Sequence, residues 1–239
     1  LMENERRNEH AKNELITSVA HDLRTPLTSI IGYLDLASSK ELTEEVRKKY
    51  VEVAYSKSKR LEKLIEDLFT YTKYSLDGVQ LNPTTFNLSK MLNQLIEEFY
   101  PSFEENQLTV ETEGLSGDVM ISGDVNLLVR VFTNIIMNAI KYGKHGKLIK
   151  IGLIERESFL LVRVTNYGEM IQKDELENIF KRFYRVETSR NENTGGSGLG
   201  LAIAKTIVEL HQGSINVISD YEGTTFTIKL IKSNECDRK

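Results

Sequence analysis

The first part of the chain carries the hydrophobic pattern of a long packed helix. Apolar residues recur at alternating steps of four and three from Ile16 to Ala37. This spacing is typical of the seam of a helix in a bundle or coiled coil, so we predict a helix over Glu3–Ala37. The polar run Ser38–Leu42 ends it. The seam positions are Ile16, Ala20, Leu23, Leu27, Ile30, Leu34 and Ala37.

A second apolar stripe predicts a second long helix. Thr43 can cap this helix, and the stripe continues from Val46 to Tyr71 before the pattern ends near Ser75–Gly78. Two helices with a short connection form an antiparallel hairpin. A two-helix hairpin cannot bury its apolar stripe alone, so we expect two copies to pair as a four-helix bundle.

After Pro83 the pattern changes to alternating strands and helices, which predicts an α+β sandwich with helices on one face of a mixed sheet. We therefore predict an α + (α+β) chain, with a helical hairpin at 1–78 and the sandwich at 79–239. Asn87 can cap the first expected helix, and Asp124 starts the second. The expected helices are Leu88 to about Tyr100, Asp124–Tyr142, about Asp174–Phe183 and Leu199–Leu210, and the expected strands are Leu108–Glu113, Val119–Ser122, Leu148–Ile154, Phe159–Thr165, Ser214–Ile218 and Thr224–Ile231.

Composition narrows the classes of function. The net charge is −4 with both signs interspersed, so no basic surface indicates nucleic acid. The single cysteine, Cys236, and four scattered histidines favour neither a disulfide framework nor a transition-metal site. No apolar run is long enough to span a bilayer, and no signal-peptide pattern occurs. The charged helical pattern begins at Glu3 without a cap, so we expect a fragment of a longer protein.

His21 has an environment suited to chemistry. It lies one residue past a seam position, so its ring should point about 100° away from the seam, toward solvent. Thr25 shares its face and Asp22 flanks it. The ring of Pro26 would clash with the backbone carbonyl of Asp22, four residues earlier in the helix. We therefore predict a kink beside the histidine. Taken alone, such a histidine is more often an ordinary surface residue.

The helix expected after Asp124 is apolar nearly all round but has one polar edge, formed by Arg130, Asn134, Asn138 and Lys141. An amide oxygen can bind a hard cation such as Mg²⁺, and lysine can contact phosphate. The alternative to such a binding site is that these polar side chains form the solvent-exposed side of the helix and bind no ligand.

The segment Gly195–Leu201 is rich in glycine and opens the last expected helix. Backbone amides at such a helix start can approach an anion. A glycine loop alone is a weak signal, because many loops use glycine merely to turn.

Together these motifs resemble the boxes of sensor histidine kinases, in order and spacing, from His21 to Ile231. His21 with Pro26 resembles the H-box. The other matches are Asn134–Tyr142 to the N-box, Phe180–Arg185 to the F-box, Gly196–Leu201 to the second glycine box and Gly223–Thr225 to the turn that closes the nucleotide site.

The first glycine box departs from the family pattern. The segment Asn166–Ile171 stands where Asp-x-Gly-x-Gly is usual, so Asn166 replaces the adenine-binding Asp and Met170 replaces the second glycine. Asn still offers a carbonyl acceptor, but a neutral one makes a weaker bond than a carboxylate. With Asn at this position, the chain is most similar to the vancomycin-resistance sensors.

The resemblance implies a dimeric kinase core with a histidine kinase/gyrase/chaperone-like ATP-binding domain. ATP–Mg²⁺ would phosphorylate His21, and the phosphoryl group would pass to the receiver domain of a response regulator. Asp22 would orient the ring or accept its proton, and Thr25 would serve dephosphorylation of the regulator. The core would be the cytoplasmic portion of a membrane-anchored bacterial sensor, with its membrane segments absent from this chain.

For the nucleotide, the resemblance implies that Asn138 holds Mg²⁺ and that Asn134 and Lys141 contact phosphate. Tyr142 and Asn166 would contact adenine, and residues 186–197 would fold over ATP as a lid. The full nucleotide-binding set is Asn134, Asn138, Lys141, Tyr142, Asn166, Gly168, Ile171, Gly196, Gly198, Leu199, Gly200 and Thr225.

Two alternatives stay open at this point. The altered residues Asn166 and Met170 are compatible with a degenerate, non-catalytic dimeric signalling scaffold. An ATPase of the gyrase or chaperone type is less favoured, because the chain has the histidine hairpin and no transducer domain.

Overall fold

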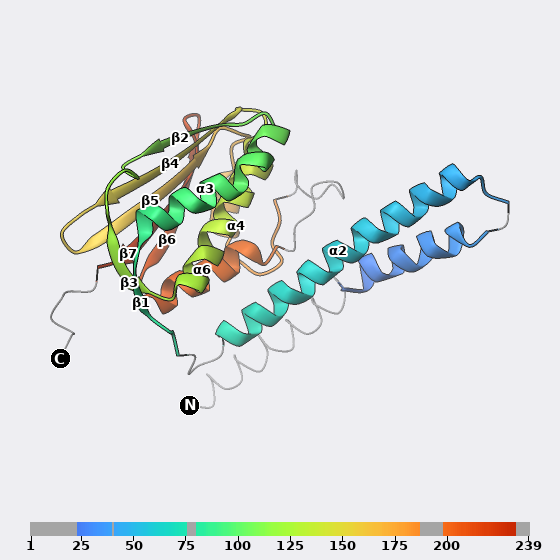
Figure 1. Cartoon of the computed structure of the whole chain (residues 1–239), viewed down its shortest axis with the longest axis horizontal. Helices are drawn as coiled ribbons and strands as arrows, with labels where there is room; N and C mark the ends of the chain where they lie inside the picture. The colour runs from blue at the N-terminus through green and yellow to red at the C-terminus, as the bar shows by residue number, and fades with distance from the viewer. Residues whose placement is uncertain (1–22, 40, 76–79, 187–197, 233–239) are drawn as a thin grey trace. The chain divides into compact units, whose positions relative to one another are not determined.

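A computed structural model of the chain describes residues 23–39, 41–75, 80–186 and 198–232. The chain divides into two compact units, and this division falls after Phe69, inside the second long helix. Figure 1 shows this helix as α2 (Glu44–Ser75) and the strands of the second unit. The domain bounds 1–78 and 79–239 stay a prediction. Within the described ranges, no helix is both long and apolar enough to cross a membrane.

The first unit contains the predicted helical hairpin. Residues 23–37 are helical, and α2 spans Glu44–Ser75. Thr43 begins α2 as expected, because its Oγ1 accepts a hydrogen bond from the N–H of Val46 at 3.5 Å. The rings of Tyr33 and Tyr50 meet across the hairpin with centroids 6.0 Å apart.

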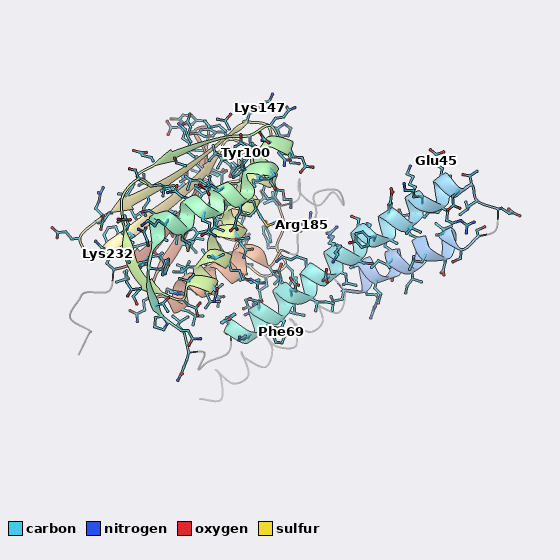
Figure 2. All side chains as sticks on the ribbon, viewed as in Figure 1. Glu45, Phe69, Tyr100, Lys147, Arg185 and Lys232 are labelled. Atoms are coloured by element: carbon cyan, nitrogen blue, oxygen red, sulfur yellow. The ribbon has the colours of Figure 1, made fainter. Side chains whose placement is uncertain are left out.

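The hairpin buries only part of its apolar stripe. Ile30 and Leu64 are buried, but Leu34 is 45% exposed and Ile31 is 52% exposed. Phe69 on α2 is 70% exposed (Figure 2). Contiguous exposed apolar side chains on a helix indicate a surface that packs against another protein surface.

The second unit is built on a five-stranded mixed sheet of order β2-β4-β5-β7-β6. Only β2 and β4 pair in parallel; the other neighbours are antiparallel. A separate antiparallel pair joins β1 to β3. The strands are β1 Thr84–Asn87, β2 Thr109–Glu113, β3 Met120–Gly123, β4 Leu148–Glu155, β5 Phe159–Asn166, β6 Ser214–Asp220 and β7 Gly223–Ile231.

Three helices cover one face of this sheet, as the sequence predicts: α3 (Leu88–Glu105), α4 (Val125–Gly143) and α6 (Gly200–Leu210) (Figure 1). The caps predicted at Asn87 and Asp124 are present, each accepting a hydrogen bond from a backbone N–H of the first turn. Residues along α4 such as Leu128, Phe132 and Ile135 are completely buried, so α4 is the centre of the core.

Helix α3 is longer than predicted. It continues through Pro101 to Glu105 instead of ending at Tyr100. Proline removes one helical hydrogen bond, at a cost of about 3 kcal/mol in a helix interior. The last turn of α3 offsets this cost by burying Phe103, whose ring also packs beside that of Phe99 with centroids 6.3 Å apart.

The prediction of a helix over Asp174–Phe183 is wrong in length, because the observed helix α5 covers only Lys173–Leu176. Beyond it the chain turns so that the ring of Phe180 meets the edge of the Phe226 ring on β7. Phe183 then takes a positive φ of 59°, which a helix cannot contain. The short strand β1 is also missing from the sequence-based assignment, and it forms only by pairing with β3.

His211 ties the end of α6 to the start of α4. Its Nε2 accepts a hydrogen bond from the N–H of Asp124 at 3.0 Å, and its Nδ1 lies 2.8 Å from the carbonyl oxygen of Ile207. A ring that accepts at Nε2 and donates at Nδ1 is the neutral tautomer. His211 therefore has a structural role.

We expect His211→Ala to lower the free energy of unfolding by about 1–3 kcal/mol, because the part-buried N–H of Asp124 loses its acceptor. Chemical denaturation monitored by circular dichroism measures this. His145→Ala is the control, since His145 is exposed and its removal should change stability by less than about 0.5 kcal/mol. Equal stability of the two variants would contradict the structural role of His211.

Candidate nucleotide-binding site

The polar edge predicted on α4 exists. Asn134, Asn138 and Lys141 are half-buried along one side of a helix whose other faces are in the core. Asn134 Nδ2 donates a hydrogen bond to the carbonyl oxygen of Gly200 at 3.0 Å, so Asn134 connects α4 to the first turn of α6. Its amide NH₂ therefore has a structural partner, while its carbonyl oxygen stays available as an acceptor.

The C-terminal end of α4 presents a cation beside an aromatic ring. Lys141 Nζ donates a hydrogen bond to the hydroxyl of Tyr142 at 2.8 Å and lies 4.6 Å from the centroid of that ring. Lys141, predicted to contact phosphate, and Tyr142, predicted to contact adenine, are therefore in direct contact with each other. A positive charge held at this position can attract an anionic ligand.

Asn166 is the most unusual polar residue of the unit. It ends β5, it is 2% exposed, and its Oδ1 has no hydrogen-bond partner within the described residues. Buried polar atoms are almost always paired, because an unpaired acceptor loses its hydration without compensation. A ligand that brings a donor N–H to Asn166 would supply the missing partner.

Gly168 allows the chain after β5 to lie directly against the end of α4. A Cβ at Gly168 would lie 1.8 Å from the carbonyl oxygen of Tyr142, and its third-nearest neighbour would be Asn166 Nδ2 at 3.4 Å. Gly143, the last residue of α4, likewise faces Asn166, whose Cβ would lie 3.1 Å from a Cβ at Gly143. Glycine at these positions brings Tyr142 and Asn166 together.

Ser219 organises the neighbouring strand ends. Its Oγ accepts a hydrogen bond from the N–H of Ile171 at 2.9 Å and lies 2.7 Å from Thr224 Oγ1. Ile171 is therefore held at the site through its backbone, beside the end of β6. The sequence analysis missed Ser219, because a single serine on a strand carries no distinctive pattern.

The strand register places Thr224, rather than the predicted Thr225, on the face of Asn166. Thr224 is the cross-strand partner of Asn166 and is 3% exposed. Thr225 pairs with Thr165, and their hydroxyl oxygens lie 2.8 Å apart. Since adjacent residues of a strand point to opposite faces, Thr225 lies on the sheet face away from Asn166. Thr224 lies at the same every-second-residue spacing as the apolar residues Phe226, Ile228 and Leu230, which are buried. This period-two pattern in the sequence could have indicated that Thr224 faces the core and Thr225 does not.

The second glycine motif lies at the start of α6. Gly198 has a φ of 70°, and its carbonyl oxygen accepts a hydrogen bond from the N–H of Phe183 at 3.0 Å. A Cβ at Gly198 would lie 2.8 Å from the backbone of Phe183, so only glycine fits. Leu199 is fully buried, and Gly200 begins the helix with its backbone N–H groups at the positive end of the dipole.

Several predicted residues fall outside the described ranges: His21, Asp22, Gly196 and residues 187–197 of the lid expected over 186–197. Thr25 is exposed on the helix over 23–37. The kink predicted at Pro26 is not tested, because it depends on the carbonyl of Asp22.

Two protein-family models match the chain. The model described as "His Kinase A (phospho-acceptor) domain" matches residues 11–75. The model described as "Histidine kinase-, DNA gyrase B-, and HSP90-like ATPase" matches residues 123–234.

Among curated proteins, the chain is 40% identical over 225 residues to "Sensor protein VanSC" of Enterococcus gallinarum, covering 94% of this chain and 62% of that protein. It is 39% identical over 223 residues to "Sensor protein VanS" of Enterococcus faecium, covering 93% of this chain and 58% of that protein. It is 32% identical to "Sensor histidine kinase WalK" of Bacillus subtilis, covering 92% of this chain and 36% of that protein. The chain thus spans at most about three fifths of the length of these relatives.

Solved structures share the fold. The histidine kinase AdeS of Acinetobacter baumannii superimposes with a TM-score of 0.70 at 24% identity, covering 90% of this chain and 98% of that chain. The histidine kinase ThkA, solved in complex with the response regulator protein TrrA, gives a TM-score of 0.79 at 24% identity, covering 98% of this chain and 65% of that chain.

Proposed function

This chain belongs to the sensor histidine kinase family, and from that premise we propose that it is a kinase core that uses ATP to phosphorylate His21. The phosphoryl group then passes to an aspartate of a response regulator. The observation that carries the proposal is the Oδ1 of Asn166, which is buried and unpaired within the described ranges and lies near the backbone of Tyr142 and Gly168.

Adenine fits the residues around Asn166. Its amino group is a donor that can satisfy the buried Oδ1, and its flat ring can lie against the aromatic ring of Tyr142. Gly168 leaves room for this close approach because it has no side chain. The hydroxyl of Thr224, on the same sheet face, adds a polar group to the base subsite.

The polar edge of α4 suits the triphosphate. Lys141 supplies a positive charge, and the start of α6 at Gly200 supplies backbone N–H donors. Asn138 would hold Mg²⁺ through its amide oxygen, a hard donor, since Mg²⁺ usually takes few protein ligands alongside phosphates and water. When bound, the ion would neutralise phosphate charge.

His21 is the proposed nucleophile. An imidazole nitrogen of His21 would attack the γ-phosphorus of ATP, the bond to the β-phosphate oxygen would break, and ADP would leave. Asp22 would accept the proton from the other ring nitrogen as the imidazole acquires the phosphoryl group. A neutral imidazole is available because the ordinary pKa of histidine is about 6.5.

The exposed apolar stripe of the hairpin supports dimerisation. Side chains such as Ile31, Leu34 and Phe69 would be covered when two hairpins form a four-helix bundle. As part of the same proposal, the core is joined to membrane segments in the full-length sensor, and its type is that of the vancomycin-resistance sensors.

Two measurements test the function. Calorimetry with a non-hydrolysable ATP analogue should show binding, and labelled ATP should give a phosphoprotein that is labile in acid and stable in alkali. No binding at millimolar nucleotide, in protein shown to be folded, would contradict the proposal and favour the non-catalytic scaffold. Steady hydrolysis of ATP without a phosphoprotein would favour an ATPase.

We expect Thr25→Ala to leave phosphorylation of His21 intact and to slow dephosphorylation of the regulator by about 100-fold, the scale of a lost proton-transfer or water-positioning group. Thr25 is exposed and follows His21 by four residues in the sequence, the spacing that puts two residues on one face of a helix, so it would position the attacking water. Release of phosphate from labelled regulator measures this. Thr28→Ala, also exposed on this helix, is the control. Unchanged dephosphorylation in Thr25→Ala would exclude the role.

A further inference from the structure

Asn166 has an amide that nothing in the described part of the protein holds in one orientation. Its Oδ1 is buried without a hydrogen-bond partner. Two of its neighbours, Gly143 and Gly168, have no side chains. Its cross-strand partner Thr224 has its hydroxyl engaged with Ser219, which is also bonded to the N–H of Ile171. The surrounding polar groups therefore pair with one another and leave the amide of Asn166 to the ligand.

An amide differs from a carboxylate because it carries both an acceptor and a donor. Rotation of the terminal torsion by about 180° exchanges the carbonyl oxygen and the NH₂ group, since this torsion is broad and roughly two-fold. A carboxylate at the same position would present acceptors in either orientation.

The two purine classes present opposite patterns to such a side chain. Adenine has an amino donor at position 6 and an acceptor at N1. A 6-oxopurine, as in guanine or hypoxanthine, has an oxygen acceptor at position 6 and a donor N–H at N1. One orientation of the Asn166 amide pairs with adenine, and the rotated orientation pairs with a 6-oxopurine held in the same pose. A carboxylate would instead face the 6-oxygen acceptor to acceptor.

We propose that Asn166 widens the base specificity of the nucleotide site, so that it accepts 6-oxopurine nucleoside triphosphates as well as ATP. This inference rests on the proposed function, because it assumes that the base lies against Asn166. It makes Asn166 a specificity-determining residue.

The test compares the affinities of the β,γ-imido analogues of ATP and inosine triphosphate by calorimetry. Inosine changes position 6 and N1 of the purine without adding the 2-amino group of guanine. The wild-type protein should bind the two analogues within about tenfold of each other. In Asn166→Asp the inosine analogue should be rejected by about 100-fold or more, because a carboxylate accepts from the adenine amino group but has no donor for the 6-oxygen of inosine and leaves two acceptors facing each other.

The control is Asn216→Asp, which makes the same change in charge at an exposed position of β6 and should leave the ratio of affinities unchanged. Wild-type protein that binds the ATP analogue but rejects the inosine analogue by more than about 100-fold would overturn the inference and leave the kinase function standing. An Asn166→Asp variant that still binds both analogues equally would also overturn it. Wild-type protein that binds neither analogue would contradict the proposed function itself.

Discussion

Gly168→Ala should reduce the affinity for an ATP analogue by more than about 100-fold, the loss that a displacement near 1 Å can cause in a site. The added Cβ would lie 1.8 Å from the carbonyl oxygen of Tyr142, a backbone atom that no rotamer change can move. The chain after β5 must therefore separate from the end of α4. This separation pulls Asn166 away from Tyr142, so the base loses its hydrogen-bonding partner and its aromatic contact together.

Gly152→Ala is the matched control for this variant. Gly152 lies in β4, and a Cβ there would meet nothing within 4 Å. Calorimetry should show unchanged nucleotide affinity for Gly152→Ala, and circular dichroism should show that both variants are folded. A folded Gly168→Ala protein with wild-type affinity would show that the contact between β5 and α4 does not form the base subsite.

His21→Gln should abolish incorporation of label from ATP. Glutamine carries no nucleophilic ring nitrogen, so the covalent step cannot occur. Nucleotide affinity should stay at the wild-type level, because the residues proposed to bind ATP belong to the other unit of the protein. Radiolabel incorporation and calorimetry on the same preparation measure the two properties separately.

His10→Gln is the control for His21→Gln, because it makes the same substitution elsewhere in the N-terminal segment. It should be labelled as the wild type is. Label that persists in His21→Gln would move the phosphorylation site to another residue, and acid-stable label would indicate a hydroxyl instead of a histidine.

Local patterns in the sequence were sufficient for most of the elements. The strict spacing of apolar residues predicted the two helices of the hairpin, and Thr43, Asn87 and Asp124 marked the starts of helices correctly. These features depend on interactions within one or two turns, which the sequence displays directly. The family resemblance rested on the order of several motifs and is confirmed by the two family matches.

Long-range packing decided the elements that the sequence missed. The helix expected to end at Tyr100 continues through Pro101 to Glu105, because burial of Phe103 extends it by another turn. The helix expected to reach Phe183 ends at Leu176, because Phe180 packs on β7 and Phe183 pairs with Gly198, far along the chain. Propensity cannot show such contacts, because their partners are distant in sequence.

The chemistry of the site divides in the same way. The sequence by itself determined that His21 and the polar edge of α4 are residues to consider, because each interrupts a regular pattern with a reactive or polar group, and the family resemblance added Asn166. Only the tertiary structure decided that Thr224, and not Thr225, shares the face of Asn166, and that the oxygen of Asn166 is buried without a partner among the residues that the structure describes. Strand register and burial arise when separate segments pack together, so they are properties of the folded protein.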